Sequence, residues 1–328
     1  MSEAFLHRPV MVDEVVDLLR PVPPGVVVDA TVGAGGHALA LLEARPDLHL
    51  VGLDRDGEAM TAAAEALAGF GGRVVLRRAR FDDITTTVQE LGHETGESGD
   101  ISGVLFDLGV SSPQLDRPGR GFSYRAEGPL DMRFDVRQSL TAAVVVNEYA
   151  EEDLARVLHE HGGERFARRI ARAIVATRPL DTTEELVDVI RATIPAPARR
   201  RGGHPAKRTF QAIRIEVNGE LELLPGAIDQ AVDVLMPGGR AVVLSYHSGE
   251  DRIVKQRFTH AATGGCTCPQ GLPCVCGAQA VVRLLGRRAR RPSTNEVTTN
   301  PRSASARLRA CQKLPVSHGE PGPDGDAA

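Results

Sequence analysis

The sequence has no long hydrophobic run, little lysine and few cysteines outside one short segment. No apolar stretch among its 328 residues approaches the ~18 that a membrane-spanning helix needs. The N-terminus also lacks the apolar region of a secretory signal peptide. We therefore expect a cytoplasmic protein that makes no contact with a membrane. The three lysines, against 36 arginines, indicate a GC-rich genome rather than a function.

The chain also lacks an overall positive charge, since its net charge is −4. A nucleic-acid-binding domain usually carries a basic excess. Two segments depart from this average: residues 165–208 hold eleven Arg and Lys against four Asp and Glu, and residues 283–309 hold eight against one. Each segment carries a net charge of +7, and the remainder carries −18. We expect these segments to be the ones that meet a nucleic acid, in a complex that salt weakens steeply.

Short apolar runs alternate with helical segments along the first hundred residues. We predict strands at residues 26–30, 48–53, 74–76 and 104–106, and helices at residues 37–44 and 57–68. Buried strands separated by helices are typical of an α/β fold, with a parallel sheet covered on both faces.

The pattern changes in the middle of the chain, where helical periodicity continues without a convincing strand. It predicts a helical domain inserted into one sheet domain. Residues 235–239 should end a helix, residues 240–245 should resume the sheet, and residues 281–285 and 306–314 should form a final hairpin. We predict the sheet core at residues 1–115 and 226–315, the insert at residues 116–225, and a disordered tail at residues 316–328.

A glycine-rich turn follows the first predicted strand and opens a helix. Its sequence, Gly33-x-Gly35-x-x-Ala38, satisfies the relaxed dinucleotide fingerprint, and Asp54 stands about 20 residues further on. Such glycines let the backbone approach a ligand, and the acid can accept hydrogen bonds from ribose hydroxyls. NAD and S-adenosylmethionine both carry a ribose, so this turn alone does not choose between them.

The end of the fourth predicted strand favours methyl transfer. Asp107 is followed by the loop Ser111-Ser112-Pro113-Gln114, without the His or Tyr that a hydride-transferring dehydrogenase needs there as a proton donor. Methylation of an exocyclic amine requires hydrogen-bond acceptors that localise the nitrogen lone pair toward the methyl group. Asp107, Ser111, Ser112 and Pro113 are therefore the candidate catalytic residues.

Motifs along nearly the whole chain resemble those of the bacterial 16S ribosomal RNA (cytosine-N4)-methyltransferase family, also called MraW or RsmH. The motifs are His7-x-Pro9-Val10, DATVGAGGH (29–37), LDRD (53–56), DLGVSSPQLD (107–116), RGFSY (120–124), GPLDMR (128–133), GERFARRIARAI (163–174), RTFQAIRIEVNGEL (208–221), HSGEDRIVK (247–255) and NPRSASARLR (300–309). The chain departs from the family pattern at Phe134, Gly249 and Ala304, where Met, Leu and Arg are common.

The resemblance implies a Rossmann-like, class I S-adenosylmethionine-dependent methyltransferase sheet with an inserted substrate-recognition domain. It implies methyl transfer to N4 of a cytosine in the decoding region of 16S ribosomal RNA, with the small ribosomal subunit as partner. The target base must leave any stack to reach the methyl group. The residues implied to contact S-adenosylmethionine are Gly35, Gly36, His37, Asp54, Phe81, Asp107 and Gln114.

Basic residues at helical spacing form the candidate RNA-binding surface, together with two residues at the start of a later helix. The candidates are Arg165, Arg168, Arg169, Arg172, Arg199, Arg200, Arg201, Lys207, Arg208, His247 and Ser248. Two alternatives stay open. The segment at 247–255 is either a helix start capped by Ser248 or part of the cytosine pocket. Asp131 and Arg133 form either an internal ion pair or an RNA contact.

Four cysteines lie within eleven residues, at Cys266, Cys268, Cys274 and Cys276. They could form a tetrahedral zinc site or a flexible thiol loop. A catalytic role is not expected, because methylation of an exocyclic nitrogen needs no covalent adduct.

Other functions remain open from the sequence alone. The protein could methylate DNA or another RNA position, or it could be a nucleotide-binding module without catalysis that uses the insert for assembly. The oligomeric state, and the choice between free RNA and an assembled subunit, are also left open.

Overall fold

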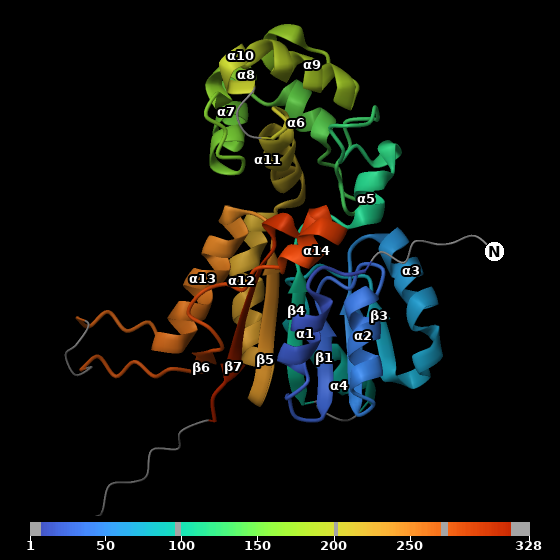
Figure 1. Ribbon diagram of the computed structural model, residues 1–328, viewed down its shortest axis with the longest axis vertical. Helices are drawn as coiled ribbons and strands as arrows, with labels where there is room; N and C mark the ends of the chain where they lie inside the picture. Colours follow the sequence, from blue (N-terminus) through green and yellow to red (C-terminus); the bar gives the residue numbers. More distant parts are fainter. Residues whose placement is uncertain (1–7, 96–99, 200–202, 270–274, 316–328) are drawn as a thin grey trace, which may run out of the picture.

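The computed structural model describes residues 8–95, 100–199, 203–269 and 275–315. Its strands form one seven-stranded sheet in the order β3-β2-β1-β4-β5-β7-β6 (Figure 1). The strand bounds are β1 Gly25–Asp29, β2 Leu48–Leu53, β3 Val74–Arg77, β4 Ile101–Asp107, β5 Leu235–Ser245, β6 Val282–Leu284 and β7 Arg307–Lys313.

The chain winds outward from the middle of the sheet in both directions. Strands β1 to β5 are parallel, whereas β7 runs antiparallel to both β5 and β6. The winding direction reverses between β1 and β4, and in such sheets ligands bind beyond the carboxyl ends of the strands at this point. The order confirms the predicted α/β fold with a Rossmann-like sheet, and the antiparallel β6–β7 pair confirms the predicted hairpin.

Helices cover both faces of the sheet because its strands carry apolar side chains in both directions. Val27 and Leu105 pack with the helices α1 and α2, while their neighbours Val28 and Val104 pack with α4, α12 and α13. Helix α3 packs beside α2. The helices of the sheet unit are α1 Val12–Leu19, α2 Gly36–Ala44, α3 Gly57–Leu67, α4 Ile84–Thr95, α12 Glu220–Val234, α13 Ser248–Thr263 and α14 Thr294–Thr299, with 3-10 turns at Ala68–Arg73 and Pro301–Ser305.

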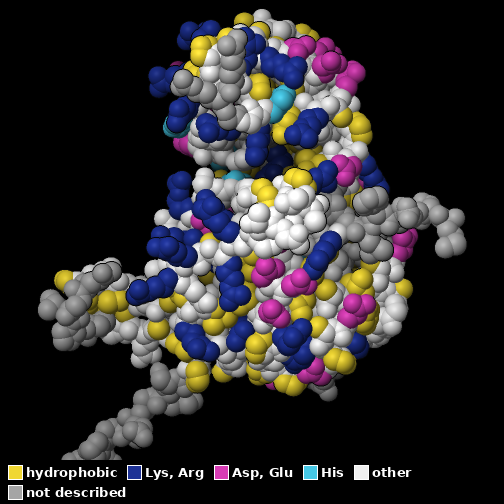
Figure 2. Space-filling model, in the orientation of Figure 1, with side chains coloured by type: hydrophobic (Ala, Val, Ile, Leu, Met, Phe, Trp, Pro, Cys, Tyr) yellow, Lys and Arg dark blue, Asp and Glu magenta, His cyan; other side chains and the backbone are white. Residues whose placement is uncertain are grey.

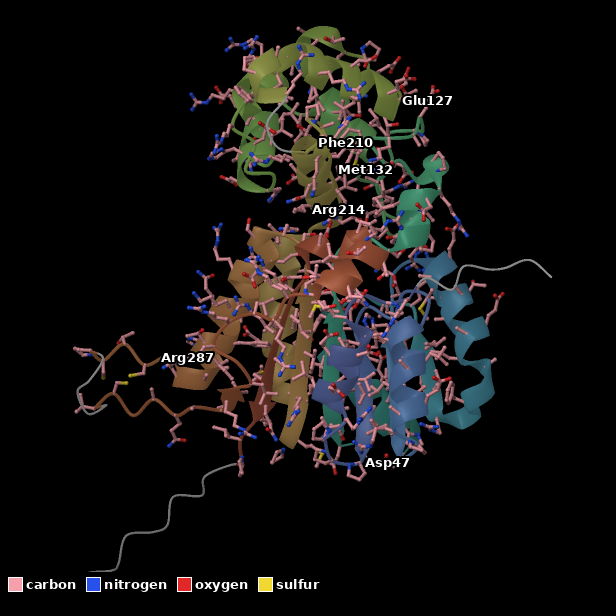
Figure 3. All side chains as sticks on the ribbon, viewed as in Figure 1. Asp47, Glu127, Met132, Phe210, Arg214 and Arg287 are labelled. Atoms are coloured by element: carbon pink, nitrogen blue, oxygen red, sulfur yellow. The ribbon has the colours of Figure 1, made fainter. Side chains whose placement is uncertain are left out.

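The insert has a hydrophobic core of its own and stands beyond the carboxyl edge of the sheet (Figure 1). Its core includes Met132 and Phe210, which Figure 3 places above Arg214, at the end of α11 nearest the sheet. Arg214 donates to both carboxylate oxygens of Glu220 at 2.8 and 2.9 Å and so ties α11 to α12. The elements of the insert are α5 Ser112–Asp116, the turn Pro118–Arg120, α6 Ala142–Glu148, α7 Glu151–Glu160, α8 Ala167–Thr177, α9 Thr183–Thr193, α10 Ala196–Arg199 and α11 Lys207–Asn218.

Two predicted boundaries differ from the structure. Residues 235–239 do end a helix, since Leu235 is the C-cap of α12, but they already belong to β5, because Leu235 pairs with Ile101 of β4. The predicted domain limit at residue 225 falls inside α12, which packs with α13 and α4. Residues 316–328 lie outside the described part of the chain. Within the described part, no helix is both long and apolar enough to cross a membrane.

Candidate functional site

Three carboxylates gather where the parallel strands end. Asp29 closes β1, Asp107 closes β4, and Asp54 directly follows β2. Burial raises the pKa of all three, to about 8 for Asp29, where the nearby Asp107 and Asp54 add to the shift. Carboxylates crowded in this way favour a cationic ligand, because a positive charge offsets both their desolvation and their repulsion. This edge therefore fits S-adenosylmethionine, whose sulfonium and amino groups are positive.

Replacing Asp29 by Asn is expected to flatten the pH dependence of the free energy of unfolding. The pKa of Asp29 is about 8 in the folded protein against an ordinary value of 3.8, so folding takes up a proton between these values. The wild-type free energy of unfolding should fall as pH rises through this range, by up to ~1.4 kcal/mol per pH unit from this group. Asn keeps an oxygen for the Thr31 N–H, which now donates to Asp29 at 3.2 Å. Urea unfolding across this range measures the difference.

The exposed Asp188 on α9 provides the matched control. Asp188→Asn should leave the wild-type pH dependence unchanged. Parallel pH profiles for the wild type and Asp29→Asn would show that Asp29 is ionised in the folded protein at neutral pH and would contradict the prediction.

The glycine-rich turn is shaped by the backbone and by its packing against the N-terminal segment. Gly33 and Gly35 have φ of 53° and 84°, in the left-handed region that favours glycine. The Gly33 N–H donates to Asp54 Oδ2 at 3.0 Å. A Cβ on Gly36 would lie 2.5 Å from Cγ of Pro9, so glycine at this position allows the N-terminal segment to close over the turn.

His37 joins this turn to the end of β4. The ring is buried, and its Nε2 lies 3.0 Å from the carbonyl oxygen of Val10. Because a carbonyl only accepts, Nε2 carries the proton. Its Nδ1 lies 3.5 Å from Asp107 Oδ2. His37 therefore links the N-terminal segment at Val10 to the carboxylate that ends β4.

Asp107 has a second partner that the sequence did not point out. The hydroxyl of Tyr246 donates to Asp107 Oδ1 at 2.6 Å, and the Asp107 N–H donates to the Thr31 hydroxyl at 2.6 Å. Burial and the adjacent carboxylate of Asp107 raise the pKa of Tyr246, so the phenol keeps its proton. Tyr246 directly follows β5, and the rule that functional groups follow strand ends could have identified it.

The loop after β4 is held in place by Gln114. Its Oε1 accepts from the Ser111 N–H at 3.0 Å, and its Nε2 donates to Asp56 Oδ2 at 2.8 Å. Pro113 stands in the first turn of α5, where its missing N–H costs nothing. The loop therefore lies against the acidic segment after β2. The side chain of Ser112 lies outside the described part of the structure.

Phe81 follows β3 and lies on the same side of the sheet as the carboxylates. Its ring meets the ring of Phe106, the residue before Asp107, edge to face at a centroid distance of 6.4 Å. It remains half-buried, so part of the ring is available to a flat ligand. This arrangement is compatible with the adenine contact that the family resemblance implies.

The helix start after β5 is capped by His247 and not by Ser248, which corrects the capping expectation. His247 Nδ1 accepts from the N–H groups of Gly249 and Glu250 at 3.2 and 3.4 Å, and its Nε2 lies 3.2 Å from Glu250 Oε1. The His ring reaches these donors while the Ser248 side chain is exposed. A Cβ on Gly249 would lie 3.1 Å from both His247 and Leu221, so the cap is tightly packed there.

Asp131 and Arg133 form the internal ion pair. Arg133 donates to both carboxylate oxygens of Asp131, at 3.0 and 2.7 Å, and its remaining donors reach the carbonyls of Val136 and Gln138 at 2.8 and 2.7 Å. This guanidinium organises the loop between the turn Pro118–Arg120 and α6.

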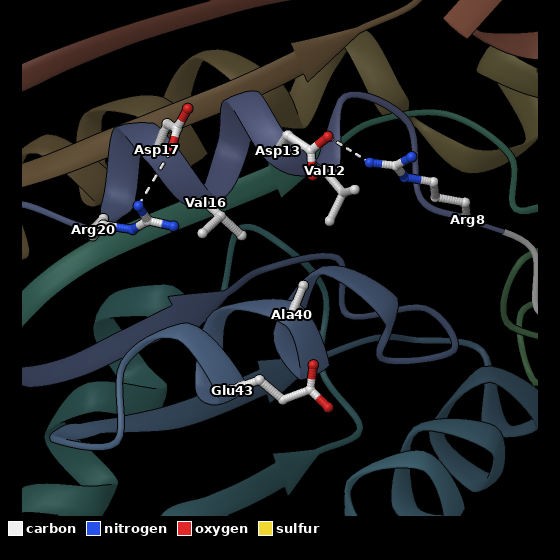
Figure 4. Close-up of a pocket in the computed structure, with 8 residues that line it drawn as sticks. All are labelled: Arg8, Val12, Asp13, Val16, Asp17, Arg20, Ala40 and Glu43. Atoms are coloured by element: carbon white, nitrogen blue, oxygen red, sulfur yellow. Dashed lines mark hydrogen bonds and ion pairs between the residues drawn. The ribbon is translucent and has the colours of Figure 1, made fainter.

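Two surface cavities lie outside the carboxylate edge. One, of about 450 Å³, lies between α1 and α2 and is bordered by the ion pairs Arg8–Asp13 and Arg20–Asp17 (Figure 4). The other, of about 810 Å³, is lined by the residues that follow β2 and β3 and by the insert. Its basic residues are Arg55, Arg80 and Arg137.

The candidate basic residues of the insert are exposed. Arg172 forms an ion pair with Glu151, with its Nε 3.3 Å from Glu151 Oε1, and Arg208 donates to the Gly163 carbonyl at 3.2 Å. Arg200 and Arg201 lie outside the described residues. The exposed candidates are Arg165, Arg168, Arg169, Arg172, Arg199, Lys207 and Arg208.

Three arginines of the second basic segment, residues 283–309, form ion pairs with carboxylates of this chain. Arg302 pairs with Asp116 at 2.5 Å, and Arg307 and Arg309 each pair with Asp251 at 2.7 Å. The charge of +7 therefore overstates what this segment offers to a nucleic acid. Its exposed arginines without a carboxylate partner among the described residues are Arg283, Arg287, Arg288, Arg290 and Arg291.

Comparison with known proteins places the chain among methyltransferases. The model of the MraW methylase family matches residues 4–314. The chain is 53% identical over 320 residues to the ribosomal RNA small subunit methyltransferase H of Mycobacterium sp. (strain KMS), covering 95% of this chain and 85% of that protein. It is 51% identical over 316 residues to the protein of the same name from Symbiobacterium thermophilum, covering 95% and 98%.

Among solved structures, an rRNA methylase from Streptococcus thermophilus is similar with a TM-score of 0.41 and 14% identity, over 95% of this chain and 100% of that chain. Among the described residues, the sheet has one antiparallel strand, β7. Since the family model spans nearly the whole sequence, the chain belongs to the MraW methylase family of methyltransferases.

Proposed function

We propose that the protein transfers a methyl group from S-adenosylmethionine to N4 of a cytosine in the decoding region of 16S ribosomal RNA. The observation that carries the proposal is the carboxylate of Asp107, held between the Tyr246 hydroxyl and the His37 ring at the reversal point of the sheet. The names of relatives that share about half of the sequence support a ribosomal RNA substrate. The reaction would then take place in the cytoplasm, on the small subunit or its RNA.

Asp107 orients the amine. The N4 lone pair is delocalised into the cytosine ring, so an acceptor on the N–H groups is needed to direct it toward the methyl group. One oxygen of Asp107 is occupied by Tyr246, which leaves Oδ2 as the oxygen that faces a substrate. S-adenosylmethionine supplies the electrophilic methyl group, and the released proton leaves to solvent without a dedicated base.

The carboxylate edge and its loops would hold the cofactor, and the loop after β4 would border the substrate. We assign cofactor binding to Gly35, Gly36, His37, Asp54, Phe81, Asp107 and Gln114, and the substrate side of the site to Ser111, Ser112 and Pro113. The cap role of His247 favours an internal structural function for its ring. Ser248, which is exposed beside it, stays a candidate for contact with RNA.

RNA would enter between the insert and the sheet unit. In Figure 2, Lys and Arg side chains gather over the insert and along one side of the sheet unit, and they border the hollow between the two. The cavity of about 810 Å³ is lined by Arg55 and Arg80 of the sheet unit and by Arg137 of the insert. A base flipped out of its stack could reach the Asp107 edge from there. We therefore propose that the insert is the substrate-recognition domain.

Removing two charges from α8 is expected to weaken RNA binding and to reduce its salt dependence. Arg168 and Arg169 are exposed, and no ion pair of theirs is found among the described residues. If each contacts one phosphate, Arg168→Gln/Arg169→Gln should lower the slope of log K against log salt by about 1.4–1.8. Fluorescence titration of labelled RNA over a salt series measures this slope.

The matched control is Arg20→Gln at the end of α1. Its guanidinium is also exposed, and its carboxylate contact is one oxygen of Asp17 at 3.8 Å. It should leave the slope at the wild-type value. Equal slopes for the wild type and the α8 double variant would remove α8 from the RNA surface.

The proposed activity is tested with purified protein, labelled S-adenosylmethionine, and ribosomal subunits or RNA from cells that lack this modification. We expect label in 16S RNA that is recovered after digestion as N4-methylcytosine. Label on DNA, label on another position of the RNA, or cofactor binding without any transfer would each contradict the proposal.

A further inference from the structure

Three cysteines come together on the segment that joins α13 to β6. Cys266 and Cys268 follow the end of α13, and Cys276 lies on the returning chain. Their sulfur atoms all lie within 4.8 Å of one another. In Figure 1 this segment projects from the side of the sheet unit, away from the strand ends that carry Asp107. The methyl-transfer site therefore makes no use of these thiols.

We propose that Cys266, Cys268 and Cys276 bind one structural zinc ion as thiolates. Cys274, the fourth cysteine of the predicted set, lies outside the described residues. A zinc–thiolate bond of about 2.3 Å places the sulfurs of a tetrahedral site about 3.8 Å apart. An equilateral triangle with 4.8 Å sides has its centre about 2.8 Å from each corner, so movements of about 0.5 Å bring all three sulfurs to bonding distance. Soft thiolate ligands select zinc over magnesium or calcium.

The backbone already brings the two ends of this segment together. Gly264 ends α13 with φ of 60°, and a Cβ there would lie 2.3 Å from the Gln279 carbonyl oxygen, so the outgoing and returning chains are in contact. The Val281 N–H donates to the Ala261 carbonyl at 2.9 Å. Gly277, next to Cys276, has φ of 70° and supports a tight turn. The cysteines thus sit on a closed base, which reduces the entropy that metal binding must overcome.

No apolar core holds the segment in place. Among the described residues between 264 and 281 none is buried, and the side chain of Val275 is 89% exposed. Short segments that bury no hydrophobic surface are commonly stabilised by a metal or a disulfide. In a reducing compartment a zinc–thiolate centre is the more durable of the two. A metal held by the three cysteines would therefore supply the stabilisation that hydrophobic packing does not give this segment.

Metal analysis of the purified protein tests the proposal. Protein prepared without added metal or chelator should contain about one zinc per chain, and Cys266→Ser/Cys268→Ser should contain less than ~0.1. The matched control is Cys311→Ala: Cys311 is buried in β7, where burial raises the pKa of its thiol to about 12, and its loss should leave the zinc content unchanged.

Cobalt substitution provides a readout that needs no variant. Adding Co²⁺ to the metal-free wild-type chain should produce a thiolate-to-cobalt charge-transfer band, which Zn²⁺ then abolishes. Limited proteolysis between α13 and β6 should become faster after chelation and return to its original rate with Zn²⁺ alone.

Several outcomes would overturn the zinc site: protein without zinc that also fails to take up Co²⁺, a disulfide between two of these cysteines in the purified protein, or an unchanged zinc content in the double variant. None of these readouts depends on methyl transfer. The zinc site and the proposed activity can therefore fail independently.

Discussion

Asp107→Ala should lower the rate of methyl transfer by about 10³-fold, the scale of losing one group that stabilises charge in a transition state. The substitution removes the oxygen that faces the substrate amine. It also leaves the hydroxyl of the half-buried Tyr246 without its acceptor at 2.6 Å. Single-turnover rates at saturating S-adenosylmethionine measure the chemical step, and a separate titration measures cofactor affinity.

The conservative variant and the pH profile separate charge from position. Asp107→Asn retains an oxygen for Tyr246 but loses the charge, so it should lose activity while keeping the wild-type fold. Because burial raises the pKa of Asp107, wild-type activity should increase with pH as this carboxyl ionises. Asp188→Ala, on the exposed face of α9, is the control. Turnover of Asp107→Ala within about threefold of the wild type would exclude Asp107 from the reaction.

Asp251→Ala should destabilise the protein by about 3–5 kcal/mol, because breaking a buried ion pair leaves an uncompensated charge. Asp251 is only 6% exposed and accepts at 2.7 Å from Arg307 and from Arg309, whose side chain is 15% exposed. These bonds tie the start of α13 to β7. The free energy of unfolding from urea titration measures the loss.

Asp17→Ala is the matched control, since the Asp17–Arg20 pair is exposed on both sides and 3.8 Å long. It should change stability by less than ~0.5 kcal/mol.

Burial by itself raises the pKa of Asp251, but the hydrogen bonds from Arg309 and Arg307 outweigh it and bring the pKa below its ordinary value. The contribution of Asp251 is therefore present above pH about 4 and disappears as pH falls below it. An Asp251→Ala loss no larger than that of Asp17→Ala would contradict this account.

The sequence predicted the elements whose formation is local. Alternation of apolar runs and helices marked β1, β2 and β4, because each strand buries side chains on both faces and each is bounded by Gly or Asp. The same reasoning was incomplete at residues 235–239, which end α12 and also begin β5. A Pro-Gly-Gly sequence resembles the end of a helix, and only the pairing of Leu235 with β4 draws it into the sheet.

The same division holds at the candidate site. Asp54 and Asp107 could be named from the sequence because the carboxyl ends of parallel strands share one edge. The same rule could have named Tyr246 as a candidate, but not its partner, since its hydroxyl meets a carboxylate 139 positions earlier in the chain. The close contact between Gly36 and Pro9 likewise arises only when the N-terminal segment folds back over the turn.

The sequence by itself therefore determined the fold class, the family and the acidic strand ends, since these depend on periodicity and on residues close together in the chain. The tertiary structure alone decided which groups pair. It paired Arg307 and Arg309 with Asp251, so that two positive charges of the segment 283–309 are neutralised inside the molecule. It also brought three cysteine sulfurs within 4.8 Å of one another. Hydrogen bonds and ion pairs act over a few ångströms, so their partners are set by the folded path of the chain and not by distance along it.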